Sequence, residues 1–315
     1  MIIASCPLRI SLVGGSTDHP SFIEKYGFGS VISFPSNLRT YVSIHQDAFG
    51  INSIENKYSI SYSKKECVHS IQEIKNELIK NCFEYLNVES INCSLTSDIY
   101  SVGSGLAASS SYLLSLIKAI YFMRNKSITE FEVCKIAEKI EKRFNPLVGQ
   151  QDFYGSMGSF KKIKFFSEKD PEFTFLSQKI FDDLEMYLIY TGIIRNSTSV
   201  LESLIIEKSL PMLEQVVELE KSINQNDLKL FNEVIINSWE TKKETSKYIC
   251  ENERLIDLDQ SLYSNKKVLS HKLCGAGNGG YFLAFTHPNS HLENDYEMIK
   301  RITISDTGLK CLEFK

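Results

Sequence analysis

The sequence has no apolar run long enough to cross a membrane. Among its 315 residues, no hydrophobic stretch approaches the ~18 consecutive apolar residues that a spanning helix needs. The N-terminal segment MIIASCPLR also lacks the basic start and the long apolar core of a secretory signal. We therefore expect a cytoplasmic protein that has no membrane partner.

The chain also lacks an excess of positive charge and any C-x-x-C pair. Lys and Arg total 35 against 39 Asp and Glu, and the net charge of −4 argues against a nucleic-acid partner. The 8 cysteines are scattered, which favours reduced thiols over disulfides or a zinc site. Because 43% of the residues are hydrophobic, a chain of this length can bury one large core or two smaller ones.

Alternating and helical apolar patterns both occur along the chain. Apolar residues alternate with other residues in the predicted strands 2–13, 40–44, 58–62 and 91–95. Further strands are predicted at 186–191, 271–274, 281–285 and 308–315. Apolar residues recur every three or four positions in the predicted helices, which cover 20–26, 66–86, 109–124, 130–144, 198–248 with a break near Pro211, 252–264 and 293–301. A capping box at Thr129 and Glu132 marks the start of one helix. This mixture predicts an α+β fold.

A charged segment divides the chain into two predicted domains. Lys161–Asp170 is a charged segment and is followed by Pro171, as is typical of a linker. We therefore expect an N-terminal domain at 1–165 and a C-terminal domain at 166–315. No internal repeat or low-complexity tract occurs in the sequence.

The stretch from Asp98 to Arg124 is the strongest functional candidate. It begins with a loop that carries Gly103 and Gly105, continues with serines at 109–111, and then becomes an apolar helix. A glycine loop that opens a helix presents unbonded backbone N–H groups at the positive end of the helix dipole, and this geometry binds phosphate. The serine hydroxyls could also reach a phosphate oxygen or Mg²⁺. The alternative is a plain capped helix, because Ser and Gly are ordinary capping residues.

Neither common nucleotide-binding glycine motif fits this chain. The pattern G-x-x-x-x-G-K-[ST] is absent, so a bound triphosphate would be held by amides, a helix dipole and a metal instead of a loop lysine. Residues 275–280, GAGNGG, satisfy G-x-G-x-x-G, but a predicted strand follows where a dinucleotide-binding domain needs a helix. We interpret this segment as a turn at which the backbone comes close to a ligand.

Three carboxylates and one arginine are the candidate chemical groups. Glu141 and Asp152 lie 11 residues apart, across the end of a predicted helix. A carboxylate near phosphates can ligate Mg²⁺, and one beside a hydroxyl can accept its proton. Arg9 and Asp18 flank a pair of glycines; Arg can neutralise a transferring phosphoryl group, and Asp can bind paired sugar hydroxyls. The alternatives are solvated surface carboxylates and a structural Arg9–Asp18 ion pair.

These stretches, in this order, resemble the motifs of the GHMP small-molecule kinases, such as galactokinase, homoserine kinase and mevalonate kinase. The similarity covers nearly the whole chain and is strongest to the bacterial D-glycero-D-manno-heptose 7-phosphate kinases and their fucokinase-like relatives. The matching segments are Pro7–Ser11 with Gly14–Asp18, Gly103–Ser111, Gly149–Asp152, Tyr190–Gly192 with Arg195 and Ser197, and Leu273–Gly280. Residues 101–102, 107–108 and 278 depart from the usual pattern without removing a charged group that the chemistry needs.

The resemblance implies a two-domain GHMP kinase fold and a role for each matching residue. The N-terminal domain would be similar to domain 2 of ribosomal protein S5, and the C-terminal domain would be ferredoxin-like and rich in helices. Asp152 would be the catalytic base or orienting carboxylate, and Arg9 would stabilise the transferring charge. The ATP phosphates would be held by Gly103, Ser104, Gly105, Leu106, Ala107, Ala108, Ser109 and Ser110. Mg²⁺ would be ligated by Ser109 or Ser110 and by Glu141. The sugar would be bound by Gly15, Thr17, Asp18, Gly277 and Arg195.

The function expected from this resemblance is ATP- and Mg²⁺-dependent phosphorylation of a small-molecule sugar. The expected acceptor is the anomeric hydroxyl of D-glycero-D-manno-heptose 7-phosphate, used in nucleotide-sugar and surface-polysaccharide biosynthesis. Alternatives are another GHMP kinase, such as a fucokinase, a galactokinase or a mevalonate-type enzyme, and a non-catalytic sugar sensor on the same fold. The joint presence of Arg9, Glu141 and Asp152 argues against a sensor. The sequence leaves open whether the chain forms a homodimer.

Overall fold

Two antiparallel-rich sheets organise the chain, and the computed structural model describes residues 1–55, 57–194, 200 and 203–314. The first sheet has eight strands, in the order β12-β1-β2-β5-β3-β4, with β6 paired to β2 and β7 to β6. Its strands are β1 (Ile2–Val13), β2 (Gly29–His45), β3 (Tyr58–Ser61), β4 (Lys65–Val68), β5 (Asn92–Ser97), β6 (Lys161–Phe165), β7 (Glu172–Phe175) and β12 (Lys310–Glu313). The second sheet has the order β11-β8-β10-β9 and consists of β8 (Glu185–Tyr190), β9 (Val268–Leu273), β10 (Tyr281–Thr286) and β11 (Ile299–Ile302).

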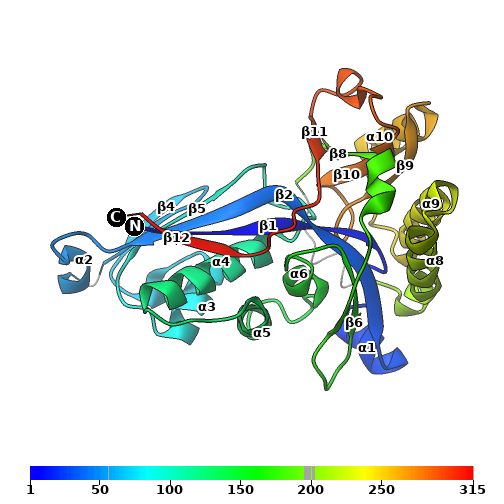
Figure 1. The fold of residues 1–315 in the computed structure, drawn as a ribbon. Coiled ribbons are helices and arrows are strands. Elements are labelled where there is room, and N and C mark those ends of the chain that lie inside the picture. The colour runs from blue at the N-terminus through cyan, green and yellow to red at the C-terminus, as the bar shows by residue number, and fades with distance from the viewer. Residues whose placement is uncertain (56, 195–199, 201–202, 315) are drawn as a thin grey trace.

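Helices cover these sheets in two groups (Figure 1). Those of the first half are α1 (Pro20–Tyr26), α2 (Ile51–Ile54), α3 (Glu77–Leu86), α4 (Ala108–Met123), α5 (Glu130–Glu141) and α6 (Gln151–Tyr154). Those of the second half are α8 (Pro211–Gln225), α9 (Leu228–Thr245) and α10 (Glu253–Ser264). The short 3₁₀ turns are η1 (Ile71–Glu73), η2 (Lys179–Asp183), η3 (Ile206–Ser209) and η4 (Leu292–Asn294). The α+β class expected from the sequence is confirmed.

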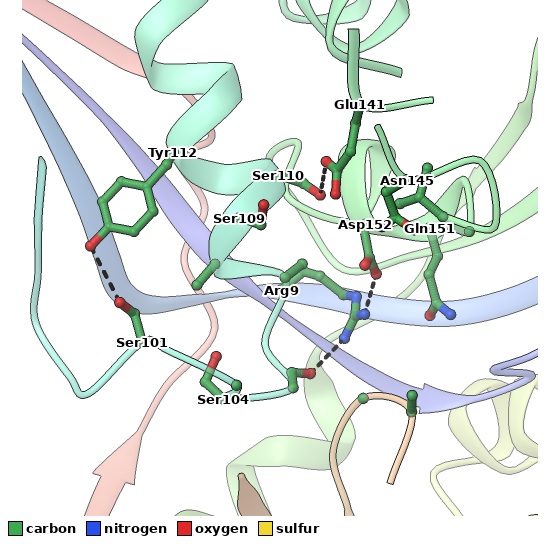
Figure 2. A pocket seen from close by; sticks show the side chains of 18 of the residues that line it. Arg9, Ser101, Ser104, Ser109, Ser110, Tyr112, Glu141, Asn145, Gln151 and Asp152 are labelled. Carbon is green, nitrogen blue, oxygen red and sulfur yellow. Dashed lines mark hydrogen bonds and ion pairs between the residues drawn. The ribbon is translucent and has the colours of Figure 1, made fainter. Parts of the chain in front are cut away.

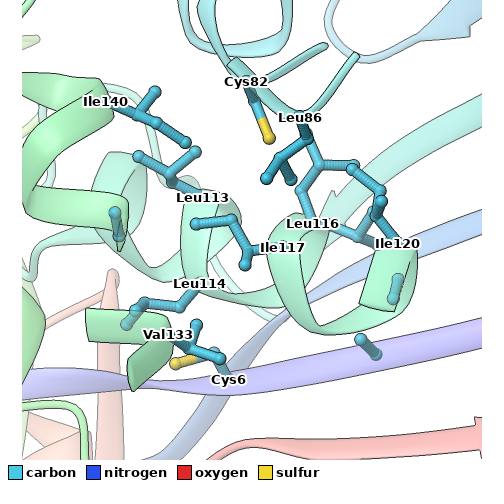
Figure 3. Packing of buried hydrophobic residues seen from close by; sticks show 14 of the residues in the cluster. Cys6, Cys82, Leu86, Leu113, Leu114, Leu116, Ile117, Ile120, Val133 and Ile140 are labelled. Atoms are coloured by element: carbon cyan, nitrogen blue, oxygen red, sulfur yellow. The ribbon is translucent and has the colours of Figure 1, made fainter. Parts of the chain in front are cut away.

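Helix α4 lies at the centre of the first core. It packs against β1 and β2 on one side and against α3 and α5 on the other. Leu113, Leu116 and Ile117 are fully buried, and Figure 3 shows them meeting side chains of α3 and α5. The prediction of a buried helix after the glycine loop is therefore confirmed. Because α4 is held on all sides, its N-terminus is fixed relative to β1.

The two long strands β1 and β2 connect the two halves of the molecule. Ala4 and Cys6 of β1 belong to the core around α4, whereas Leu8, Ile10 and Leu12 belong to a second core with α8, α9 and the second sheet. The pairing of β1 with β2 shifts register between Pro7 and Arg9 and again between Ser11 and Val13. Such bulges re-aim side chains. Here they occur where β1 passes from one core to the other.

Three sequence predictions are wrong. Residues 66–86 are not one helix, because β4 pairs with β3 and only Glu77–Leu86 is α-helical. Residues 293–301 form no α-helix, because Ile299–Ile302 pairs with β8 as an edge strand. The charged segment at 161–170 is not a linker between domains, because Lys161–Phe165 is a strand paired with β2.

Strands from the second half of the chain complete the sheet of the first half. β7 and the C-terminal strand β12 both join the first sheet, and β12 pairs with β1 at its edge. The N-terminal amine of Met1 donates to the carbonyl oxygen of Phe314 at 2.8 Å, so the ends of the described chain lie together (Figure 1). Sheet membership does not follow the predicted division at residues 165 and 166. The two domains with these bounds stay a prediction. Within the described residues, none of the helices has the length and apolarity to span a membrane.

Replacing Ile117 with Ala tests the role of α4 in the core. The change removes three buried carbons from a site that neighbouring side chains enclose, so the free energy of unfolding should fall by about 2–5 kcal/mol. Urea denaturation measures this loss. The control is Ile256→Ala on the exposed side of α10, which should change stability by less than about 0.5 kcal/mol. Equal losses in the two variants would contradict the packing described here.

Candidate active site

A cavity of about 770 Å³ lies where the two halves of the chain meet. Its walls come from β1, the loop before α4, the end of α5, the start of α6, and the C-terminal elements α9 and β9. Predicted site residues that line it are Arg9, Gly15, Asp18, Gly103, Ser104, Gly105, Ala107, Ala108, Ser109, Ser110, Glu141 and Asp152. Residues separated by more than a hundred positions in the sequence therefore face one space.

The loop before α4 presents the helix N-terminus to this cavity. Ala107 caps the helix with a φ of 58°, in the left-handed region, and no side chain caps the first turn. Within the described chain, no side chain therefore supplies the cap that the alternative, a plain capped helix, leads one to expect. Ser109 is exposed at this end, whereas Ser110 is buried. Uncapped N–H groups at the positive end of a helix form a binding site for an anion such as phosphate.

The glycine turn at 275–280 supports that loop from behind. Gly105 has a φ of 81°, and a Cβ at this position would lie 2.5 Å from the carbonyl oxygen of Cys274. Gly280 has a φ of 90°, and a Cβ there would clash with the carbonyl oxygen of Ser104. The two glycine segments therefore touch through their backbones. This contact explains both sets of glycines without a dinucleotide.

Arg9 is the charged centre of the site (Figure 2). Its Nη2 atom forms an ion pair with Asp152, and its Nη1 atom donates to the carbonyl oxygen of Gly105 at 3.2 Å. Only 3% of Arg9 is exposed, whereas 27% of the Asp152 side chain is. The structural alternative of an Arg9–Asp18 ion pair is thus replaced by an Arg9–Asp152 pair. This pair places a cation and a carboxylate together beside the N-terminus of α4.

Asp18 holds the start of α6 in place. Its Oδ2 atom accepts from the backbone N–H of Gln151 at 3.0 Å, and its Oδ1 atom accepts from the Gln151 side-chain amide at 2.8 Å. A Cβ on Gly149 would clash with the Asp18 carboxylate, so only glycine allows this approach. Burial, assisted by the charge of Asp152, raises the pKa of Asp18 to about 6. The carboxylate therefore fixes the residue that precedes Asp152.

Ser110 and Glu141 form a second pair at the same end of α4. The Ser110 hydroxyl donates to Glu141 Oε2 at 2.8 Å, as Figure 2 shows. Burial, and to a smaller extent the charge of Asp152, raises the pKa of Glu141 to about 7. One carboxylate and one hydroxyl are oxygen ligands of the kind that Mg²⁺ accepts when phosphates and waters complete its shell. No cluster of three His, Cys, Asp or Glu side chains suited to a metal occurs in the part of the chain that the structure describes.

Four predicted residues do not line the cavity or cannot be placed. Thr17 is fully buried, and its hydroxyl donates to the carbonyl oxygens of Gly14 and Ser30 at 2.8 and 2.9 Å, so it shapes the turn. Leu106 is buried in the second core, and Gly277 packs against Ile249 instead of facing the cavity. Arg195 lies outside the described residues.

Two lysines that sequence reasoning missed line the cavity. Lys272 on β9 is 4% exposed and donates to the carbonyl oxygen of Leu12, and its burial lowers the pKa of the ammonium to about 8. Lys242 on α9 donates to the carbonyl oxygen of Gly275. The strand VLSHKL mixes apolar and polar residues, so no local pattern in the sequence marked Lys272 as a cavity residue.

Comparison with known proteins relates part of this chain to a known family. Residues 70–157 match the family model described as the GHMP kinases N terminal domain. The chain contains a GHMP kinase N-terminal domain. The matched segment includes the loop before α4, Ser109, Ser110 and Glu141, and it ends five residues after Asp152.

Similar proteins extend this result over the whole chain. A D-glycero-alpha-D-manno-heptose 7-phosphate kinase of Campylobacter jejuni is 26% identical over 94% of this chain and 91% of its own. The crystal structure of a D-glycero-D-manno-heptose 1-phosphate kinase from Bacteroides thetaiotaomicron superposes with a TM-score of 0.78 at 19% identity, covering 100% of both chains. A phosphomevalonate kinase of Streptococcus pneumoniae superposes at 0.76 with 12% identity, covering 96% of this chain and 99% of its own. The whole chain therefore has the GHMP kinase fold.

Glu141→Gln tests the buried carboxyl through the pH dependence of stability. Because the pKa of Glu141 rises from 4.5 to about 7 on folding, the folded state binds more protons between these values, and wild-type stability falls as pH rises through this window. Gln still accepts from Ser110 but does not ionise. Between pH 4.5 and 8, the free energy of unfolding of the variant should rise relative to that of wild type by on the order of 3 kcal/mol. Urea denaturation in EDTA measures this difference. If the stabilities of wild type and variant ran parallel with pH, the raised pKa of Glu141 would be contradicted.

Proposed function

We propose that this protein is an ATP-dependent sugar kinase that phosphorylates the anomeric hydroxyl of D-glycero-D-manno-heptose 7-phosphate. The observation that carries the proposal is the convergence of Arg9, Asp152 and the uncapped N-terminus of α4 on one cavity. Phosphoryl transfer needs mainly positioning and charge stabilisation, and these groups supply both. The heptose is proposed as acceptor because the similar Campylobacter protein is a heptose 7-phosphate kinase.

Each side chain has a distinct part in the proposed reaction. The exposed face of Asp152 accepts the proton of the acceptor hydroxyl, whose oxygen bonds to the terminal phosphorus of ATP while the bond to the bridging oxygen breaks and ADP leaves. Arg9 stabilises the charge on the transferring group and orients Asp152. The amides at the start of α4 hold the phosphates. Ser110 and Glu141, with Ser109 beside them, would hold Mg²⁺, which neutralises phosphate charge when bound.

Several finer properties belong to the same proposal. The reaction would take place in the cytoplasm. It would be a step toward nucleotide sugars and surface polysaccharide. Arg195 is our candidate, on sequence grounds, for contact with the acceptor's own phosphate. Another GHMP kinase activity is the nearest alternative. A sensor is disfavoured because Arg9, Glu141 and Asp152 together form a catalytic arrangement that sugar binding does not require.

Asp152→Asn tests the catalytic carboxylate. The amide keeps the shape of the side chain but cannot accept a proton, so kcat should fall by about 10²–10⁴-fold while ATP still binds. An ADP-release assay measures kcat, and calorimetry measures ATP binding. Asp170→Asn, at an exposed ion pair with Lys135, is the matched control and should leave kcat unchanged. Full activity in the Asp152 variant would remove it as the base.

A panel of acceptors tests the proposed substrate. The protein is incubated with ATP, Mg²⁺ and, in turn, heptose 7-phosphate, heptose, fucose, galactose and mevalonate, and ³¹P NMR locates the new phosphate. We expect phosphate on the anomeric carbon of the heptose 7-phosphate. Arg195→Ala should raise KM for the phosphorylated heptose more than for the unphosphorylated one. Transfer to mevalonate alone, or to no sugar, would refute the proposed function.

A further inference from the structure

Besides Arg9 Nε, three buried polar atoms of residues that line the cavity have no hydrogen-bond partner in the described structure. They are Ser11 Oγ, His19 Nε2 and Gln151 Oε1, from the end of β1, the N-cap of α1 and the start of α6. Ser11 and His19 are 7% and 6% exposed, so water reaches them poorly. Folded proteins rarely leave buried polar atoms unpaired, because each costs about 1–3 kcal/mol. All three atoms belong to residues that line one cavity, so a ligand bound there could pair with them.

The contacts of His19 fix which hydrogen-bonding role it has. Its Nδ1 atom accepts from the backbone N–H of Ser21 at 3.3 Å, which requires that this nitrogen carry no hydrogen. Burial lowers the pKa of the imidazole, which favours the neutral ring. In a neutral imidazole whose Nδ1 accepts, Nε2 carries the hydrogen. His19 therefore offers one N–H donor to the cavity.

Gln151 and Ser11 supply the complementary roles. The Gln151 amide group donates to Asp18 at 2.8 Å, and this contact fixes the orientation of the side chain and leaves Oε1 as an acceptor. The Ser11 hydroxyl can donate or accept. An ideal Cβ on Gly15 would lie 3.9 Å from Gln151 Nε2 and 4.0 Å from Ser11 Oγ, so the two side chains flank this glycine. Without a side chain at Gly15, the space between them stays open to a ligand.

The geometry points to a polyol-recognition site formed by Ser11, His19 and Gln151, which binds neighbouring hydroxyls of the acceptor. A hydroxyl both donates and accepts, so two or three of them satisfy a fixed donor, a fixed acceptor and a rotatable hydroxyl together. A carboxylate only accepts, so it would leave Gln151 Oε1 unpaired. At this place the site therefore favours neighbouring hydroxyls over a carboxylate. This inference rests on the proposed function and deepens it by naming residues that recognise the acceptor.

Ser11→Ala is the sharpest test, because its hydroxyl makes no hydrogen bond within the protein. Binding of D-glycero-D-manno-heptose 7-phosphate in the presence of Mg²⁺ and a non-hydrolysable ATP analogue is measured by calorimetry. The dissociation constant should rise about tenfold, while Tm and the affinity for the analogue stay unchanged. The matched control is Ser33→Ala. Ser33 pairs with Ser11 across β1 and β2 and also has an unpartnered buried hydroxyl, but it does not line the cavity.

His19→Asn tests the donor without removing the helix cap. Asn is a favoured N-cap residue whose side-chain oxygen can replace Nδ1, but its shorter side chain does not reach the position of Nε2. We expect a similar loss of sugar affinity with Tm retained. The recognition site would be overturned if wild type, Ser11→Ala and Ser33→Ala had equal dissociation constants for the heptose. It would also be overturned if wild type bound no heptose, or bound mevalonate as tightly as the heptose. If the variants lose sugar affinity as expected but wild type transfers no phosphate, the proposed kinase activity would be refuted and the recognition site would stand.

Discussion

The buried ion pair between Arg9 and Asp152 is the contact on which the rest of the site depends. A guanidinium does not lose its charge in a protein, so a buried arginine must be met by acceptors. Arg9 finds them on α6, at Asp152, and on the loop before α4, at the carbonyl oxygen of Gly105. One side chain of β1 therefore sets the positions of the carboxylate and of the loop before α4 relative to each other. The bulges of β1 and the fixed packing of α4 make this position possible.

Three carboxylates share this small region but have different partners. Asp152 contacts the arginine, Asp18 holds Gln151, and Glu141 accepts from Ser110. Burial and the nearby charge of Asp152 raise the pKa values of Asp18 and Glu141, which shows that their ionised forms lack full compensation. Because the ionised Glu141 carboxylate has no nearby positive charge among the described residues that fully balances it, a cation bound beside it would be favoured. Asp18 thus supports the structure of the site, whereas Glu141 and the partly exposed Asp152 are the carboxylates that we propose for Mg²⁺ and for the acceptor.

The sequence predicted those elements whose signals are local. The capping box at Thr129 and the buried helix α4 are confirmed because each depends on neighbouring residues. The helix predicted at 66–86 is wrong because pairing of β4 with β3 overrides a helical apolar pattern, and pairing decides likewise at 293–301. The partner of Arg9, the cavity lysine Lys272 and the unpaired atoms at Ser11 and its neighbours depend on contacts between distant segments. No spacing in the sequence encodes such contacts.

The central claim is that one cavity brings ATP, Arg9 and Asp152 together. A crystal structure of the protein with Mg²⁺ and a non-hydrolysable ATP analogue tests it most directly. The account predicts that the phosphates lie against the N-terminal amides of α4, with the terminal phosphate within hydrogen-bond reach of Arg9 and beside Asp152. A nucleotide bound away from α4, or with its terminal phosphate turned away from Arg9, would contradict the account.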